Sequence, residues 1–251
     1  MIHPELHKQP EALDRQQHKA LKLGPVNPVA ALEGLNAFFI TTVEFGDVAK
    51  EYPILFLPAG TDDKGQPQIA PVAVFGMARN ENLFLDTSGE QPRWTGRYVP
   101  AVVRAWPFGM GRLDAENYAL CIDRAAPAFS ETEGQPLFTE AGEPTDVLKE
   151  YHAFTERVEQ EVERTRMAGR KLMEMKLLQP KRFDATMPDG EKLTMDGFLG
   201  LDEDRWRALT DAEILDLHKS GLTMLVQLHQ LSLSNMGLLI ERRHGVVAVR
   251  T

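Results

Sequence analysis

Residues 52–77 read YPILFLPAGTDDKGQPQIAPVAVFGM, and they indicate how the first half of the chain folds. Two runs rich in Ile, Leu, Val and Phe flank the link PAGTDDKGQ, which consists mostly of turn-forming residues. Runs of this kind, bounded by Gly, Pro, Asn and Asp, are typical of β-strands. Because the link is too short for a helical crossover, it predicts a hairpin in an antiparallel sheet.

The same texture recurs on both sides of this hairpin. FFITTVEF begins at Phe38, and NLFLD and NYALCID follow later, so we expect an antiparallel sheet over about residues 37–125. The segment YVPAVVRAW interrupts it. Pro100 suits a first helical turn, which predicts a short helix or an extended crossing that ends at Pro107.

After about residue 144 the apolar period becomes helical. Hydrophobic residues return at three- and four-residue steps, which predicts a helix of about thirty residues, ~45 Å long, that ends at Pro180. Gly169 is expected to mark a bend or a break. KRFDATMPDGEKLTMDGF, at 181–198, then predicts a second hairpin with turn residues Pro188, Asp189 and Gly190.

LTDAEI contains the clearest local signal of the chain. Thr210 is placed as an N-cap and Glu213 as its capping-box partner, so a helix is expected to begin at Asp211. We expect it to continue to about Gly245. Its expected apolar face consists of Leu215, Leu222, Leu225, Leu228 and Leu231.

These segments predict an α+β fold, with an antiparallel sheet in the N-terminal half packed against a mostly helical C-terminal half. The expected organisation is an N-terminal arm over 1–34, a single domain over 35–243 and a tail over 244–251. The sheet part of that domain covers about 37–125 and the helical part about 144–243. His3, His7 and His18 lie in the arm and are expected to be solvated.

Composition limits the function classes. The chain has 251 residues and a formal charge of −9, which argues against general binding of nucleic acid. Cys121 is the only cysteine, so no intramolecular disulfide framework and no CxxC motif exist, and a reducing compartment fits best. The polar N-terminal sequence lacks the apolar core of a signal peptide, and no stretch approaches a membrane span. We expect a cytoplasmic protein.

Five strings in order resemble one protein family. They are EYPILFL, ENLFLD, RWTGRYVPAVVRAWPF, LCIDRAAPAFSETEGQPLFTEAGEPT and LHKSGLTMLVQLHQLSLSNMGLLIERR, and together they are similar to the SapC family from about Ala37 to Arg243. That resemblance implies a context of surface-layer export and of TonB-dependent uptake, with halogenase-like and hydroxylase genes nearby. It brings no catalytic residues to carry over.

RWTGRYVPAVVRAWPFGMGR, at 93–112, is the candidate binding segment, because it alternates arginines with aromatic residues and has no Asp, Glu or Lys. Guanidinium groups bind anions and stack on aromatic rings. The residues expected to line a site for a small anionic or aromatic ligand, or for a protein partner, are Arg93, Trp94, Arg97, Tyr98, Arg104 and Trp106.

The competing interpretation is structural. Residues 123–163 hold 11 acidic residues against Arg124, Lys149 and Arg157, a local balance of −8. The arginines of 93–112 would then pair with these carboxylates inside the fold.

No other pattern outweighs this one. Glu131, Glu133, Glu140 and Glu143 lie in a loop of the kind that holds hard cations, but their spacing matches no calcium loop. Ser130 with Glu133 is expected to cap a helical turn there. His218 and His229 are three helical turns apart, too far to share an ion on a straight helix, and are expected at polar edges of the core. We therefore expect no metal and no cofactor.

Two function classes remain. The first is a binding or adaptor protein in an envelope, surface-layer or nutrient-uptake context, which the absence of common catalytic motifs favours. The alternative is an enzyme of unrecognised class that acts with a partner or with a partner's cofactor, in an oxygenase- or halogenase-associated setting. The sequence does not fix the oligomeric state.

Overall fold

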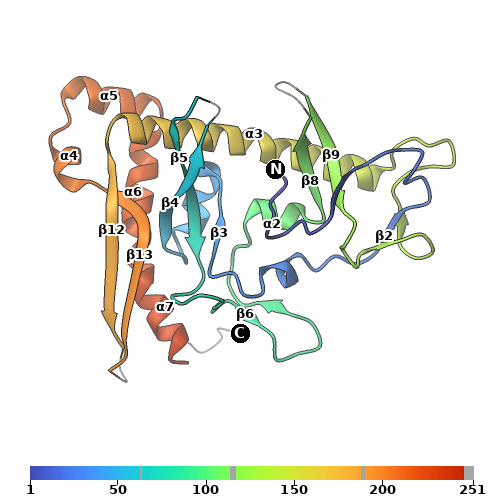
Figure 1. Cartoon of the computed structure of the whole chain (residues 1–251), viewed down its shortest axis with the longest axis horizontal. Coiled ribbons are helices and arrows are strands. Elements are labelled where there is room, and N and C mark those ends of the chain that lie inside the picture. Colours follow the sequence, from blue (N-terminus) through green and yellow to red (C-terminus); the bar gives the residue numbers. More distant parts are fainter. Residues whose placement is uncertain (63, 114–116, 188–189, 246–251) are drawn as a thin grey trace. The chain divides into compact units, whose positions relative to one another are not determined.

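A computed structural model describes residues 1–62, 64–113, 117–187 and 190–245 (Figure 1). The chain forms two compact units, each assembled from separate segments. The first unit contains Met1–Leu32, Thr87–Arg93 and Ala101–Val162. The second unit contains Glu33–Asp86, Trp94–Pro100 and the chain from Glu163 onward. The fold is α+β with antiparallel sheets, as expected.

The first unit has two small sheets and two short helices. One sheet has the order β1-β9-β8 and the other β10-β2-β11, both antiparallel. The helices are η1 (Pro28–Leu32) and α2 (Ala101–Ala105), the latter in the segment expected to be a short helix or a crossing. The strands are β1 (Pro10–Ala12), β2 (Lys22–Leu23), β8 (Phe108–Arg112), β9 (Tyr118–Asp123), β10 (Phe129–Ser130) and β11 (Gln135–Pro136).

The segment expected to be an arm belongs to this core. β1 pairs with β9, and Leu21 packs with Phe108 and Ile122 in a buried cluster. The expectation of solvated histidines is wrong for two of the three, because His7 is 3% and His18 4% exposed. Polar partners compensate their burial, and His18 Nε2 lies 3.0 Å from Glu11 Oε1.

The second unit is built on a five-stranded antiparallel sheet with the order β12-β13-β4-β5-β3. Both predicted hairpins are confirmed, although Pro188 and Asp189 of the second turn lie outside the described residues. The expectation of one sheet within 37–125 is wrong, because the C-terminal hairpin joins this sheet and β8 and β9 belong to another. The strands are β3 (Ala37–Phe39), β4 (Ile54–Thr61), β5 (Pro67–Val74), β12 (Leu178–Thr186) and β13 (Lys192–Leu201).

Two predicted strands are shorter than expected. FFITTVEF contributes only β3, and NLFLD only β6 (Leu85–Asp86), while β7 is Arg93–Trp94. After β3 the chain turns into η2 (Thr42–Glu44) and α1 (Phe45–Val48). The cause is local: the buried Glu44 carboxylate accepts hydrogen bonds from both the backbone N–H and the hydroxyl of Thr41, each at 2.7 Å.

The long helix is confirmed as α3 (Asp146–Glu174), but its predicted interruption and end are wrong. Gly169 lies inside the unbroken helix, where a Cβ would come 3.0 Å from Ile69 Cγ1, so the glycine permits close packing on β5. Pro180 lies in β12, and the chain leaves the helix earlier through Lys176, which has a φ of 55°. Residues 146–162 of α3 belong to the first unit and the rest to the second.

The predicted C-terminal helix is three helices, preceded by the short α4 (Glu203–Arg207). They are α5 (Asp211–Lys219), α6 (Leu222–Ser232) and α7 (Asn235–Arg243). The capping box of Thr210 and Glu213 is confirmed, but Gly221, with a φ of 76°, ends the continuity. The predicted apolar face is wrong at its ends, since Leu215 is 51% and Leu231 64% exposed.

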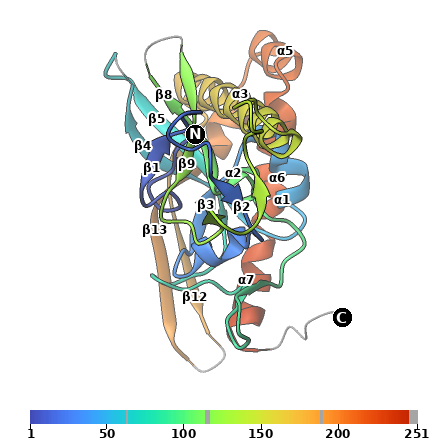
Figure 2. The same cartoon turned by 90° about the vertical axis from the view of Figure 1, so that its right-hand side faces the viewer.

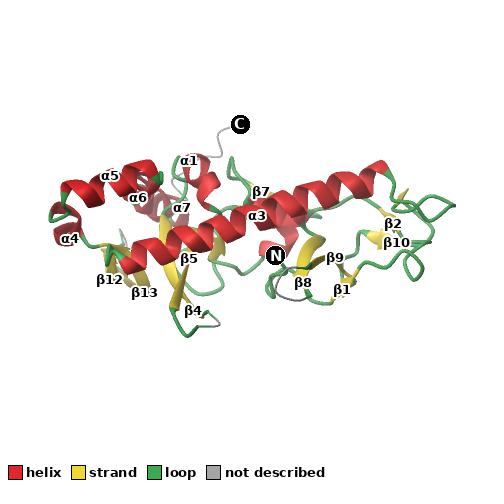
Figure 3. Ribbon diagram, turned by 90° about the horizontal axis from the view of Figure 1, so that it is seen from above, coloured by secondary structure: helices red, strands yellow, loops and turns green. Residues whose placement is uncertain are grey.

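The buried positions of α6 are instead Leu222, Val226, His229 and Ser232. Their spacing of three and four residues places them on one face. This face packs on the five-stranded sheet of the second unit, and α6 and α7 lie along one side of β4, β12 and β13 (Figure 2, Figure 3). Two of the four side chains on this face are polar, which leads to the site described next.

Candidate functional site

The candidate site lies at the point along β4 where its pairing with β13 ends. Phe56 of β4 pairs with Leu199 of β13. Two residues earlier, on the same edge of β4, the backbone of Ile54 is bound by α6 instead. Its N–H donates to Ser232 Oγ at 2.9 Å, and its carbonyl oxygen lies 2.7 Å from His229 Nδ1. Side chains from one helical turn thus replace the missing strand.

This contact fixes the chemical state of His229. A backbone carbonyl only accepts hydrogen bonds, so Nδ1 carries the proton and donates it to Ile54. The residue is 1% exposed, and this burial lowers the pKa of His229 below its ordinary value; the bond to Ile54 opposes the shift, and the charge of Lys181 lowers the pKa further. At neutral pH the ring is therefore neutral, with its lone pair on Nε2.

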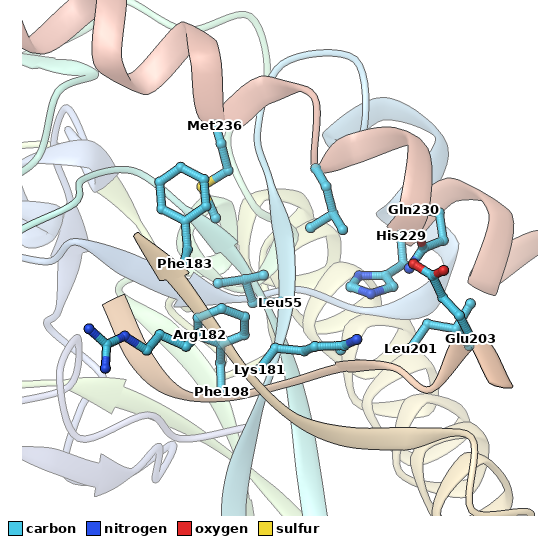
Figure 4. A pocket seen from close by; sticks show the side chains of 12 residues that line it. Leu55, Lys181, Arg182, Phe183, Phe198, Leu201, Glu203, His229, Gln230 and Met236 are labelled. Atoms are coloured by element: carbon cyan, nitrogen blue, oxygen red, sulfur yellow. The ribbon is translucent and has the colours of Figure 1, made fainter. Parts of the chain in front are cut away.

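The Nε2 atom of His229 is buried and has no hydrogen-bond partner among the described residues. His229 is one of the lining residues of a cavity of about 270 Å³ between β12, β13, β4 and the helices α6 and α7. Figure 4 shows the polar side chains His229, Lys181, Gln230 and Glu203 toward one end of this pocket and Phe183, Phe198 and Met236 toward the other. We call it the His229 pocket; its remaining lining residues are Leu55, Arg182, Gly200, Leu201 and Leu233.

The charged side chains that line the His229 pocket differ in whether they form an ion pair. Arg182 is held by Asp184, at 2.8 Å, and Glu203 by Arg207, also at 2.8 Å. Lys181 is half-buried, and Figure 4 shows its side chain extending toward His229. Within the described part of the chain, Lys181 is the lining cation for which no carboxylate partner is found. The polar end of the pocket therefore combines the positive charge of Lys181 and the uncharged acceptor of His229 with the carboxylate of Glu203, which is paired with Arg207.

Gly200 keeps this polar end open. A Cβ at this position would lie 3.0 Å from Lys181 Cγ and 3.7 Å from His229 Nε2. A side chain on Gly200 would therefore press on the aliphatic part of Lys181 and lie beside the imidazole of His229. Lys181 of β12 and His229 of α6 are thus both close to the same backbone position of β13.

The predicted binding residues of the second unit have mostly internal partners. Trp94 Nε1 donates to the Tyr98 carbonyl at 3.0 Å and to the Tyr52 hydroxyl at 3.1 Å. The Tyr98 hydroxyl donates to the buried Glu44 at 2.9 Å. The side chain of Arg97 is exposed, and its backbone N–H donates to Glu51 at 2.6 Å. Gly96 does not leave free space beside Arg97, because a Cβ there would overlap the Tyr52 hydroxyl.

The other three predicted residues belong to the first unit. Arg93 and Arg104 are exposed, and the Arg104 guanidinium lies 5.4 Å from the centre of the Phe154 ring. Trp106 is 7% exposed and donates to Asp123 at 3.2 Å, a carboxylate of the acidic region. None of the six predicted residues lines the His229 pocket. Because they are divided between the two units, their convergence on one surface stays a prediction.

The remaining candidates are placed as follows. His218 is exposed, whereas His229 is in the core, so the expectation that both lie at its edge is wrong. The four glutamates of the acidic loop are exposed, and Ser130 Oγ accepts from the backbone N–H groups of Thr132 and Glu133. The expected helical turn is wrong, because residues 131–134 form a bend without helix. No group of three or more metal-binding side chains is found among the described residues.

Sequence reasoning missed the His229 pocket, although one signal pointed to it. His229 and Ser232 occupy positions that the apolar spacing of α6 buries, and polar residues on a buried face need specific partners. The apolar face expected from the sequence contained Leu228 and Leu231 instead of Val226 and His229. The burial of His229 was therefore not recognised.

A family model described as SapC matches residues 13–239, which is most of the chain. The chain belongs to the SapC family. All lining residues of the His229 pocket lie within the matched range of this SapC-family chain. No curated protein and no solved structure matches it. In the part of the chain that the structure describes, every helix is too short or too polar to cross a membrane.

Proposed function

We propose that this SapC-family chain is a binding protein for a small anionic ligand that carries an apolar, aromatic group. The observation that carries the proposal is the Nε2 atom of His229, a buried acceptor that faces a pocket and has no partner among the described residues. A buried polar group without a partner costs about 1–3 kcal/mol, so a ligand that donates to it would recover this energy on binding.

The pocket's two ends support this ligand class. Lys181 provides a positive charge at the polar end, where an anion would be bound. Phe183, Phe198 and Met236 provide aromatic and thioether contacts at the other end. The volume of about 270 Å³ is near the lower limit of small-molecule sites, which favours a ligand with one ring rather than several.

The wider context of the proposal rests on the sequence. The cytoplasmic location is proposed from composition, and the envelope, surface-layer or nutrient-uptake setting is proposed from the family resemblance. In that setting the arginines and aromatic residues of 93–106, among them the exposed Arg97 and Arg104, would contact a protein partner, while the His229 pocket holds the small ligand.

Calorimetric titration with 3-phenylpropionate and its uncharged methyl ester tests the proposal. We expect the carboxylate to bind and the ester to bind at least about tenfold more weakly, because neither donates to His229 and only the carboxylate carries the charge that pairs with Lys181. Gly200→Ala should weaken binding, because its methyl group would lie 3.7 Å from His229 Nε2 and 3.0 Å from Lys181 Cγ. Gly46→Ala is the matched control, since a Cβ there meets nothing within 4 Å. Equal binding by both variants would refute the proposed site.

His229 also favours a second candidate function, an enzyme in which Nε2 acts as a general base. A neutral imidazole with a lowered pKa is in the correct state to accept a proton at neutral pH. The two functions differ in turnover. Mass spectrometry of a bound ligand after prolonged incubation would show the ligand unchanged for a binding protein and altered for an enzyme.

A further inference from the structure

We propose that the ligand of the His229 pocket is a carboxylate with a hydrogen-bond donor on the adjacent carbon, as in a 2-hydroxy or 2-acylamino acid with an aromatic side chain. This inference rests on the proposed function and narrows it to a chemical class. It follows from the different hydrogen-bonding properties of His229 and Lys181, which one small head group of the ligand has to satisfy together.

His229 can only accept a hydrogen bond in the pocket. Its Nδ1–H donates to the Ile54 carbonyl, and Ser232 Oγ accepts from the Ile54 N–H. Both backbone polar groups of Ile54 are therefore hydrogen-bonded to side chains of α6. Turning the ring over would place Cδ2 in the position of Nδ1 and break the 2.7 Å hydrogen bond to the Ile54 carbonyl. Burial disfavours a second proton on the ring, so the pocket presents a lone pair and not an N–H.

Lys181 makes the opposite demand. Its ammonium group has three donors and no acceptor, so it is satisfied by an oxygen that bears negative charge. A carboxylate provides that oxygen, but an ionised carboxylate has no hydrogen to donate to His229. One plain carboxylate therefore leaves one of the two groups unsatisfied.

A donor next to the carboxylate resolves the conflict. Figure 4 shows the Lys181 side chain extending toward His229, and a Cβ at Gly200 would lie 3.0 Å from Lys181 Cγ and 3.7 Å from His229 Nε2, so there is little room beside the two residues at this position. A hydroxyl or amide N–H one carbon from the carboxylate lies within such a space, with the hydrogen toward Nε2 and the charged oxygens toward Lys181. The aromatic side chain then extends toward Phe183 and Met236 at the apolar end (Figure 4).

The test compares 3-phenyllactate with 3-phenylpropionate, two acids that differ only in the 2-hydroxyl group. Titrations are performed at pH 8, above the ordinary histidine pKa of ~6.5, because a protonated ring at lower pH would donate to a plain carboxylate. We expect phenyllactate to bind at least about tenfold more tightly, since only its hydroxyl pairs with Nε2.

His229→Asn assigns this difference to Nε2. The side-chain amide nitrogen of Asn stands where Nδ1 stands, so it retains the donor to Ile54 and removes the acceptor in the pocket. In this variant the two acids should bind equally. Lys181→Met is the control for the charge, and it should weaken both acids by the same factor while preserving the preference for the hydroxyl.

The outcomes separate the two proposals. Equal binding of both acids to the wild type would overturn the donor requirement and leave the proposed function intact. No binding of either acid at about 10 mM would overturn the proposed function and the donor requirement with it. If His229→Asn does not fold, ¹⁵N NMR of the wild-type imidazole decides instead, because a donor from phenyllactate must shift the Nε2 resonance and phenylpropionate must not.

Discussion

Replacing Ser232 by Ala measures how strongly α6 is attached to β4. Ser232 is fully buried, and its hydroxyl accepts from the Ile54 N–H at 2.9 Å and donates to the His229 carbonyl at 2.6 Å. The substitution removes both hydrogen bonds and leaves the strand amide facing apolar surroundings. Among the described residues, the bond from His229 to the Ile54 carbonyl is left as the side-chain link at this position.

The expected cost follows from the burial of the amide. An unsatisfied buried donor costs about 1–3 kcal/mol, and the methyl group of Ala leaves almost no cavity. For a chain of this size, each kcal/mol shifts the melting temperature by roughly 2–4 °C, so we expect a decrease of about 2–12 °C. The Ile54 amide should also exchange its hydrogen faster in the variant.

Ser234→Ala provides the matched control. Ser234 is exposed, and its hydroxyl donates to the Leu231 carbonyl at 2.8 Å, a bond that water replaces. Its removal should change stability by no more than about 0.5 kcal/mol. Urea denaturation and thermal melts of both variants give the comparison. Equal losses in the two variants would refute the inference that Ser232 stands in for a strand.

Three further predictions concern other parts of the chain. Thr210→Ala should cost about 1 kcal/mol in urea denaturation, because α5 loses its N-cap; an unchanged midpoint would contradict this. Below pH ~6.5, His229 binds a proton in the unfolded chain but not in the folded one, because its pKa is lowered by folding. The free energy of unfolding of the wild type should therefore fall by up to about 1.4 kcal/mol per pH unit more than that of His229→Asn. Urea titrations of both proteins at several pH values test this, and identical pH slopes would exclude it. Arg97→Ala and Arg104→Ala should each lower stability by less than about 1 kcal/mol, since both side chains are exposed; a large loss in thermal melts would show a structural role instead.

Features encoded by neighbouring residues were predictable from the sequence. The capping box needs only Thr210 and Glu213, and the two hairpins need only their turns and flanking apolar runs. The length of α3 followed from its period in the same way. In each case the interacting residues are close in sequence, so one short window contains the whole signal.

Features that depend on distant partners were not predictable. The reason for Gly169 is Ile69 on another strand, and the partner of His229 is Ile54, 175 residues away. The binding segment was proposed because arginine and tryptophan stand out in composition. The indole N–H of Trp94 nonetheless donates to Tyr98 and Tyr52 inside the fold. No local sequence pattern distinguishes such an internal hydrogen bond from a contact with a ligand.

The attachment of α6 also bears on aggregation. An unpaired strand edge can recruit the strand of another molecule, and proteins usually protect such edges with charges, prolines or bulges. Here the edge of β4 at Ile54 is protected by the side chains of Ser232 and His229 on α6. Partial unfolding that releases α6 would uncover a strand edge next to buried hydrophobic residues. We therefore expect mild destabilisation to produce aggregates whose first intermolecular contacts form at Ile54.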